Sequence, residues 1–483
     1  MRNTSKILKA SSFFLVIFSI FVTYYLSQVT LFNGYGRLYL LPLSFLVCFL
    51  LFLKPVLLNR RGIFINIFIA TIFARYVLLP LLIPITNYYY FSRSMTPPDS
   101  TAVNEAVLLM TYELFVITFV FYLIFYLLRN KSLNNINKYR LINPENLSDQ
   151  EQIEFKFADN NIGYLGFFVL TVILIVLFPS ALFNFNFLRA KENLVSSFTE
   201  EGLLYSITIY CIMTLKNFMF IGLIYKASVL YKKNGNYIWV LSSIILVFLN
   251  TSIFYGISRL DIIVTFMTST IVFYKLFNSK KIFIPLGIMA LVVLSIFQSV
   301  TIARGIVGVK ESTSFLWDIA DNISIYLGGP YNVAMAIETA KFFPESRNIS
   351  VLLFDIFRPM IGVNIFIKDM PIYYSNIYFN ERISGGIRVT QIIPMIGQGY
   401  LFFGFIGAPI IGIFFIWLAK KFTVLSLKLE NSRIEIVYIV TLSCIRLGFM
   451  LGQNTMNQVN DMSMNLFLFL IVYWINNKLI YKK

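Results

Sequence analysis

The stretch "FYGISRLDIIVTFM", from Phe254 to Met267, places a turn with an arginine and an aspartate between two long apolar runs. An α-helix needs about 20 apolar residues to cross a bilayer. We therefore interpret the stretch as the connection between two membrane helices. A charge pair at such a junction needs a partner or contact with water, because an isolated charge is costly in lipid.

The composition of the whole chain supports a membrane protein. Of its 483 residues, 58% are hydrophobic and 13% are charged, whereas charged residues make up about 25% of a soluble protein. The formal net charge is +17, but the basic residues fall in short clusters between apolar runs, which argues against nucleic acid as a partner. No small-residue cleavage site follows the first apolar run, so we expect a retained membrane helix rather than a signal peptide.

Apolar segments long enough to cross a bilayer recur along the chain. We expect about twelve spans: residues 8–28, 37–57, 62–86, 104–128, 161–181, 203–230, 237–256, 259–277, 282–301, 397–419, 433–451 and 462–480. Clusters of Lys and Arg follow every second span, as the positive-inside rule predicts for cytoplasmic loops. The predicted fold is an all-α polytopic integral membrane protein with both termini in the cytoplasm and a single domain over residues 1–483.

One connection, residues 302–396, is much longer than the others, and this topology places it outside the cytoplasm. It contains eight basic and eight acidic residues. A loop of this length without secondary structure would be unusual, so we expect a large, partly helical external loop that covers a site. "SVLLFDIF" (350–357) is one amphipathic helical piece, and "GGPYN" (328–332) breaks the helical pattern as a hinge.

A second amphipathic helix is predicted at the start of this loop. Phe315, Leu316, Ile319 and Ile323 recur at helical spacing, which is typical of an amphipathic helix. We expect the helix to begin behind a Ser312 or Thr313 cap.

Arg259 is the most informative charge in the opening stretch. Ser258 and Asp261 fit a capping box, which makes Asp261 structural and places Arg259 at the first helical position. The helix dipole disfavours a cation there. Two interpretations stay open: Arg259 and the free N–H groups bind a phosphate or diphosphate, or Arg259 is a flanking arginine that reaches to the interface.

Other ionisable residues fall within predicted spans, where each costs about 3 kcal/mol unless it is paired or faces water. Arg75 and Glu113 lie at matching depth on consecutive antiparallel spans, so we expect an ion pair. Lys216 and Arg446 have no evident partner, which favours a hydrophilic cavity in the outer half. We therefore expect Lys216 and Arg446 to bind substrate.

Arginines of the external loop extend this hypothesis. Arginine suits bidentate recognition of phosphate, and a site bordered by Arg259, Arg304 and Arg388 would fit a diphosphate lipid. Arg358 and Arg382 are further candidates for substrate binding, although a solvated surface role is open for each loop arginine.

The residue types limit the chemistry. The chain has no histidine and three cysteines within apolar runs, so it lacks the usual neutral-pH base and any cysteine-based metal site. Motifs for nucleotide hydrolysis, zinc chemistry and serine hydrolysis are absent from the sequence. An acid or base would have to be a carboxylate of the external loop, for which the candidates are Asp318, Asp321, Asp369 and Glu381.

Three motifs resemble a known family. "SGGIRVTQIIPMIGQGYLFFGFIGAPIIGIF" (384–414) resembles the segment that enters a late helix in the O-antigen and oligosaccharide repeat-unit polymerases, the Wzy family. "SRLD" (258–261) and "YLGGPYNVA" (326–334) are similar to that family's arginine at an outer helix start and to its external Tyr-Gly-Pro element. Gln398 departs from the pattern, since many members have an acidic residue there.

The resemblance implies an architecture like that of the glycosyltransferase C superfamily and a metal-independent reaction without a cofactor. The enzyme would join undecaprenyl-diphosphate-linked repeat units into O-antigen or capsular polysaccharide at the outer face of a bacterial cytoplasmic (inner) membrane. Arg259, Arg304 and Arg388 would be catalytic, and Tyr326, Gly329 and Pro330 would bind substrate. Its partners would be these glycans, membrane lipids, and a flippase and chain-length regulator of the same pathway.

Two other functions fit part of the pattern. A flippase for lipid-linked oligosaccharides would share the helix number and cationic residues, but the large external loop and the lack of an internal repeat argue against it. An O-antigen ligase would share the arginines and the loop. A purely structural membrane protein would leave Arg259 and Lys216 unexplained.

Overall fold

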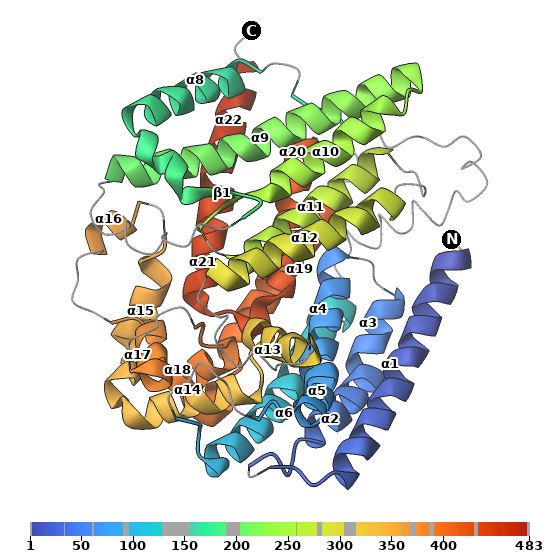
Figure 1. Ribbon diagram of the computed structural model, residues 1–483, viewed down its shortest axis with the longest axis vertical. Coiled ribbons are helices and arrows are strands. Elements are labelled where there is room, and N and C mark those ends of the chain that lie inside the picture. The colour runs from blue at the N-terminus through green and yellow to red at the C-terminus, as the bar shows by residue number, and fades with distance from the viewer. Residues whose placement is uncertain are drawn as a thin grey trace. The chain divides into compact units, whose positions relative to one another are not determined.

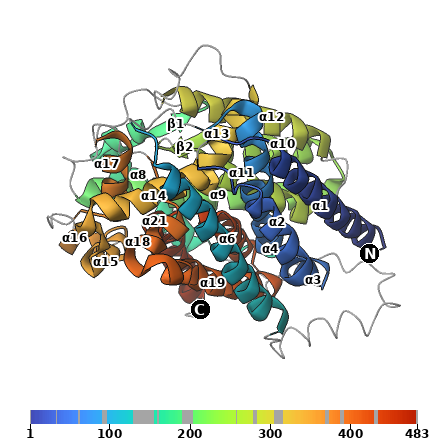
Figure 2. The ribbon, with the colours of Figure 1, turned by 90° about the horizontal axis from the view of Figure 1, so that it is seen from below.

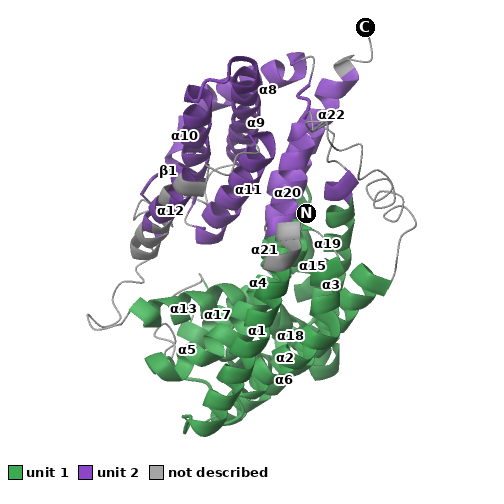
Figure 3. Cartoon of the chain, turned by 90° about the vertical axis from the view of Figure 1, so that its right-hand side faces the viewer, with its two compact units in different colours: residues 1–149, 310–424, 446–460 green, residues 150–309, 425–445, 461–483 purple. Residues whose placement is uncertain are grey.

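Helices form nearly all of the regular structure in a computed structural model of the chain (Figure 1). The structure describes residues 2–32, 34–59, 62–89, 96–127, 155–158, 161–189, 203–256, 258–277, 283–303, 315–360, 362–367, 373–385, 391–428 and 433–480. These residues divide between two compact units, shown in Figure 3: unit 1 is Met1–Asp149, Lys310–Val424 and Arg446–Asn460, and unit 2 is Gln150–Val309, Leu425–Ile445 and Asp461–Lys483. The sequence did not indicate this division.

Unit 1 combines the first membrane helices with the helices of the predicted external loop. Its α-helices are α1 (Arg2–Gln28), α2 (Leu40–Cys48), α3 (Lys54–Asn59), α4 (Ile63–Phe73), α5 (Leu79–Thr86), α6 (Ser100–Tyr122), α13 (Phe315–Leu327), α14 (Pro330–Phe342), α15 (Ile349–Phe357), α16 (Asn364–Ile367), α17 (Ser375–Ser384) and α18 (Met395–Gly407). Short π-helical stretches continue or link some of them: Phe49–Leu53, Ala74–Leu78 and Leu123–Leu127.

Unit 2 contains helices and a short pair of strands. Its elements are α8 (Ile162–Leu177), β1 (Phe185–Phe187), α9 (Leu203–Asn234), α10 (Ile238–Ser252), β2 (Ile253–Tyr255), α11 (Arg259–Phe277), α12 (Phe283–Ala303) and α22 (Leu468–Ile480). Three helices have residues in both units: α19 (Ile410–Lys428), α20 (Ile434–Gly448) and α21 (Thr455–Met462).

The chain is an all-α polytopic membrane protein. Among the described residues, seven helical segments are long and apolar enough to cross a membrane: Leu8–Gln28, Leu40–Asn59, Ile63–Thr86, Ser100–Leu127, Leu204–Asn234, Arg259–Phe277 and Ile410–Lys428. The shorter apolar helices α8 and α10 also fall within predicted spans, and α18 overlaps the span predicted over 397–419. The total of twelve spans, the side on which each loop lies and the glycosyltransferase-like architecture stay predictions.

At two of the predicted spans the difference from the structure has a clear local cause. The span predicted over 237–256 ends at Ser252, because Ile253–Tyr255 is strand β2, paired antiparallel with β1 so that Asn186 faces Phe254. The opening stretch therefore begins in a strand rather than in a helix. The span predicted over 397–419 is also interrupted: α18 has a kink at Gly404, whose φ is +66°, and a turn at Ala408 and Pro409 separates α18 from α19.

Part of the prediction for the external loop is confirmed. α13 and α15 confirm the two helices, and the predicted cap residues Ser312 and Thr313 lie outside the described residues. In α13, Phe315 and Leu316 are exposed, while Ala320, Asp321 and Ser324 are buried. The exposed residues are large and apolar, which is favourable for a face in contact with lipid.

α14 is the central helix of unit 1, although it belongs to a loop. Its residues from Pro330 to Ala340 are all buried, and it packs against α6, α17 and α18 (Figure 2). A helix buried on every side is part of a core rather than a surface cover. The sequence predicted a cover over a site and did not anticipate this core helix.

The break at "GGPYN" is tight and buried. Gly328 has a φ of +68°, and a Cβ there would lie 2.5 Å from the side chain of Pro394. Pro330 then begins α14, where its missing N–H costs nothing. These contacts favour a fixed turn over the predicted hinge.

The predicted pairing of Arg75 with Glu113 is confirmed. The Arg75 Nη1 atom lies 2.8 Å from Glu113 Oε2, and both side chains are buried. The Tyr76 hydroxyl donates to the same carboxylate at 2.8 Å, and Arg75 Nε donates to the Gly328 carbonyl at 2.9 Å. The ion pair therefore joins two membrane helices to the turn before α14.

We expect either single substitution, Arg75→Ala or Glu113→Ala, to lower the yield of folded protein, because removing one partner of a buried ion pair costs about 3–5 kcal/mol. The double variant Arg75→Glu/Glu113→Arg should recover part of the yield, since it keeps the pair but loses the bonds to Tyr76 and Gly328. Size-exclusion chromatography of a fluorescent fusion measures this. A double variant no better than the Arg75→Glu and Glu113→Arg single variants would contradict the pairing.

Candidate functional site

Asp355 is the centre of a buried polar cluster in unit 1. It lies on the buried face of α15 with an exposed fraction of 0%. Ser375, the first residue of α17, donates its backbone N–H to Asp355 Oδ1 at 3.1 Å and its hydroxyl to Oδ2 at 2.5 Å. Gln398 of α18 donates its amide to Oδ2 at 2.6 Å. Donors from two other helices thus fix the orientation of the carboxylate.

The environment of Asp355 changes its proton affinity. Burial raises the pKa of the Asp355 carboxyl to about 6, while the hydrogen bonds from Ser375 and Gln398 and the charge of Arg358 act in the opposite direction. Such a group exchanges a proton close to neutral pH, which is the range of an effective general base.

Gln398 connects Asp355 to the start of α21. Its Oε1 atom accepts from both the backbone N–H and the hydroxyl of Thr455, each at 2.8 Å. The oxygen must therefore face Thr455 and the nitrogen must face Asp355, which defines the orientation of the amide. Gln398 is fully buried, so its role here is to hold Asp355 in place.

Asparagines continue this polar cluster. Asn376 Oδ1 accepts from the Ile393 N–H at 2.9 Å and from Asn454 Nδ2 at 3.2 Å. Asn380 donates to the Gln391 carbonyl at 2.8 Å and accepts from the Gln391 N–H at 2.9 Å. The segment before α18 is therefore held by side chains of α17.

Arg358 lies beside Asp355 at the C-terminal end of α15. Its guanidinium is 4.7 Å from the ring centroid of Tyr374 and 5.8 Å from that of Phe354. Stacking on an aromatic face leaves the edge of the guanidinium available for hydrogen bonds. Because Arg358 is half-buried, it can present a planar set of donors next to a buried acid.

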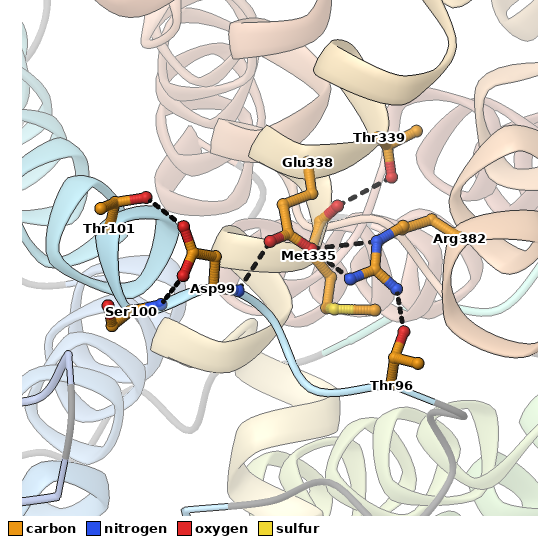
Figure 4. A network of polar contacts seen from close by, with 8 residues as sticks. All are labelled: Thr96, Asp99, Ser100, Thr101, Met335, Glu338, Thr339 and Arg382. Carbon is orange, nitrogen blue, oxygen red and sulfur yellow. Dashed lines mark hydrogen bonds and ion pairs between the residues drawn. The ribbon is translucent and has the colours of Figure 1, made fainter.

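Arg382 has a different environment from the one that the sequence predicted. Its Nε atom donates to Glu338 Oε2 at 2.9 Å, and its Nη1 atom donates to Thr96 at 2.8 Å (Figure 4). The other Glu338 oxygen accepts from the Asp99 N–H at 2.7 Å. This network ties α17 to α14 and to the start of α6, so Arg382 is engaged in a structural ion pair.

The predicted carboxylates are scattered. Asp321 is buried and accepts from the Tyr88 hydroxyl at 3.0 Å. Asp318 and Glu381 are exposed. Asp369 lies outside the described residues, as do Arg304 and Arg388.

Three further predicted residues lie near the turn before α14. Tyr326 is half-buried near the end of α13, and Gly329 and Pro330 are buried at the start of α14. A Cβ at Gly329 would lie 2.6 Å from Leu79. Gly329 and Pro330 are thus packed against other side chains of unit 1. Substrate binding by Tyr326, Gly329 and Pro330 stays a prediction.

Arg259 and Lys216 belong to unit 2. Arg259 begins α11 as predicted and is fully buried, which contradicts the alternative of an arginine that reaches to the interface. The Ser258 hydroxyl accepts from the Asp261 N–H at 3.4 Å, as the predicted cap requires. The prediction that Lys216 has no partner is wrong, because its ammonium group donates to the carbonyls of Asn250 at 3.0 Å and Ile253 at 2.8 Å.

These bonds give Lys216 a local structural role. A lysine at the last carbonyls of α10 compensates the partial negative charge of that helix end. The predicted substrate-binding residue Arg446, in unit 1, is also buried. Among the described residues, no three His, Cys, Asp or Glu side chains come together as a metal-binding group.

The sequence contained a signal for Asp355 that was missed. Asp355 follows Val351 by four residues and therefore shares its helical face, which is the buried face of α15. An acid on an apolar face is unusual because burial of an unpaired charge is costly. The polar run Gln453–Thr455 was a second signal, since it stands between two apolar segments.

Comparison with known proteins adds no relative: no protein-family model, curated protein or solved structure matches the chain. The resemblance to repeat-unit polymerases rests on the motifs alone.

We expect the free energy of unfolding to fall by about 3 kcal/mol as the pH rises from about 4 to 6. In this range folded Asp355, with its pKa of about 6, keeps its proton. The unfolded chain, with an aspartate pKa near 3.9, has lost it. The Asp355→Asn variant should lack this component. Thermal denaturation of both proteins in detergent between pH 4 and 8 measures it. Parallel pH dependences would show that Asp355 has an ordinary pKa.

Proposed function

We propose that the protein is a membrane-embedded glycosyltransferase that joins oligosaccharide repeat units carried on undecaprenyl diphosphate into a polysaccharide, at the outer face of the cytoplasmic membrane. The observation that carries the proposal is that Asp355, a buried carboxyl with a pKa of about 6, lies one helical turn from Arg358, whose guanidinium stacks on Tyr374. The motifs that resemble repeat-unit polymerases add the substrate class.

The reaction requires a base and a cation. A hydroxyl of the acceptor sugar attacks the anomeric carbon of the donor, and its proton passes to Asp355 as the new C–O bond forms. The bond from the anomeric carbon to the diphosphate breaks, and the diphosphate leaves with the electron pair. The guanidinium of Arg358 stabilises the negative charge that develops on it, as preorganised donors do in other transferases.

The arrangement suits these two roles. Asp355 cannot rotate freely, because Ser375 and Gln398 hold both of its oxygens. α15 lies outside the membrane-spanning helices, and its face opposite Asp355 exposes Leu353 and Phe357. A helix with an apolar outer face fits a site that receives a lipid carrier as well as a sugar.

Purified protein incubated with a lipid-linked repeat unit tests the proposal. A polymerase produces a ladder of longer glycans that remain attached to the lipid. A flippase moves the substrate across a vesicle membrane without a ladder, and a ligase transfers the glycan to a different lipid. Either of the latter two results would refute polymerisation.

We expect Asp355→Asn to slow chain growth by about 10²–10⁴, the usual contribution of a general base. The wild-type rate should rise with pH up to about 6, the pKa of the Asp355 carboxyl, and then level off. Glu345→Gln, at an exposed carboxylate near the same helix, is the matched control. An Asp355→Asn variant with normal rate and normal pH dependence would exclude Asp355 as the base.

Arg259 stays a separate hypothesis for diphosphate binding, since it is a cation at the positive end of its own helix. We expect Arg259→Ala to insert normally and to lose about 10²–10³ in rate, and Arg259→Lys to recover part of it, because lysine lacks the bidentate fork. The length and amount of polymer measure both variants. If Asp261→Asn abolishes activity while Arg259→Ala retains it, then Asp261 is the catalytic residue and Arg259 is not.

A further inference from the structure

An apolar groove of about 600 Å³ lies within unit 2, between α8, α9 and the segment 155–158. Leu165 and Phe168 line it from α8, and Phe218 and Leu223 line it from α9. Its size is within the range of ligand pockets in proteins, about 300–1,000 Å³.

The walls of the groove are typical of a surface in contact with lipid. Leu165 is 66% exposed, Met219 is 47% exposed and Leu223 is 44% exposed. Side chains of this size are unfavourable in water, but they are stable next to hydrocarbon chains. The groove therefore suits an acyl chain.

The polar end of the groove is positive. α8 and α9 pack antiparallel, since Tyr164 contacts Phe218 with ring centroids 4.6 Å apart, while Ala181, just after α8, belongs to one apolar cluster with Ile209. This packing brings Asn161, at the start of α8, to the same end as Lys226 of α9. Lys226 is exposed, and it is the charged residue among those that line the groove.

The surroundings add positive charge at this end. Lys156 lies in the segment that borders the groove. The N-terminal end of α8 contributes the partial positive charge of its dipole. A lysine near a membrane surface attracts anionic headgroups by about 1 kcal/mol.

We propose that this groove binds an anionic glycerophospholipid, with one acyl chain between α8 and α9 and the headgroup phosphate at Lys226 and Asn161. The site is formed within unit 2 and does not depend on the polymerase function. Such a lipid would stabilise the packing of α8, whose outer residues, such as Val176 at 74%, are highly exposed.

Native mass spectrometry of the purified full-length protein, with phosphatidylglycerol and phosphatidylcholine added in equal amounts, tests the proposal. Wild-type protein should retain phosphatidylglycerol preferentially. Lys226→Gln should reduce this preference about fivefold, and Lys226→Arg should keep it. Lys232→Gln is the matched control, because Lys232 lies on the same helix but does not line the groove.

Gly222→Leu tests the apolar part of the site. A Cβ at Gly222 would meet Phe157 at 3.5 Å, an ordinary contact, so the longer leucine side chain should fill the groove and reduce binding of both lipids. Melting temperatures show whether each variant is folded.

Three outcomes would overturn the proposal. They are the absence of a headgroup preference in the wild type, equal effects of Lys226→Gln and Lys232→Gln, and displacement of phosphatidylglycerol by undecaprenyl phosphate at equal concentration. The last would make the groove a site for the isoprenoid carrier instead.

Discussion

Arg75 and Glu113 bring opposite charges into the interior of unit 1, where neither would be stable alone. Their pairing also acts beyond the two helices that carry them. Arg75 binds the carbonyl of Gly328, and Gly328 is the residue at which α13 ends and the chain turns into α14. The ion pair thus fixes the point at which a segment far away in the sequence enters the core.

The position of α14 determines how the candidate site is assembled. Because α14 packs against α18, it positions the helix that carries Gln398. Gln398 in turn holds Asp355 on one side and Thr455 on the other. A continuous set of contacts therefore runs from a buried ion pair to the candidate base, and each contact satisfies a polar group that would be costly to bury without a partner.

The sequence predicted the parts of this arrangement that depend on local pattern. Apolar length gave the membrane helices, the Gly-Gly-Pro run gave the break before α14, and matching depth gave the ion pair of Arg75 and Glu113. The partners of Arg382 and Lys216 could not be predicted in the same way. They depend on Glu338 and on the end of α10, and such contacts arise from tertiary packing rather than from sequence spacing.

The proposed transfer needs a base near neutral pH, and in a chain without histidine another side chain must supply it. A fully solvated aspartate is a weak base because water stabilises its charge. A buried one without donors would stay protonated and could not accept a proton. Asp355 lies between these limits, since burial raises its pKa while Ser375, Gln398 and Arg358 stabilise the ionised form. This balance requires Asp355, Ser375, Gln398 and Arg358 together. The polar cluster on α15, α17 and α18 therefore offers the proposed transfer a base that no histidine of the chain can supply.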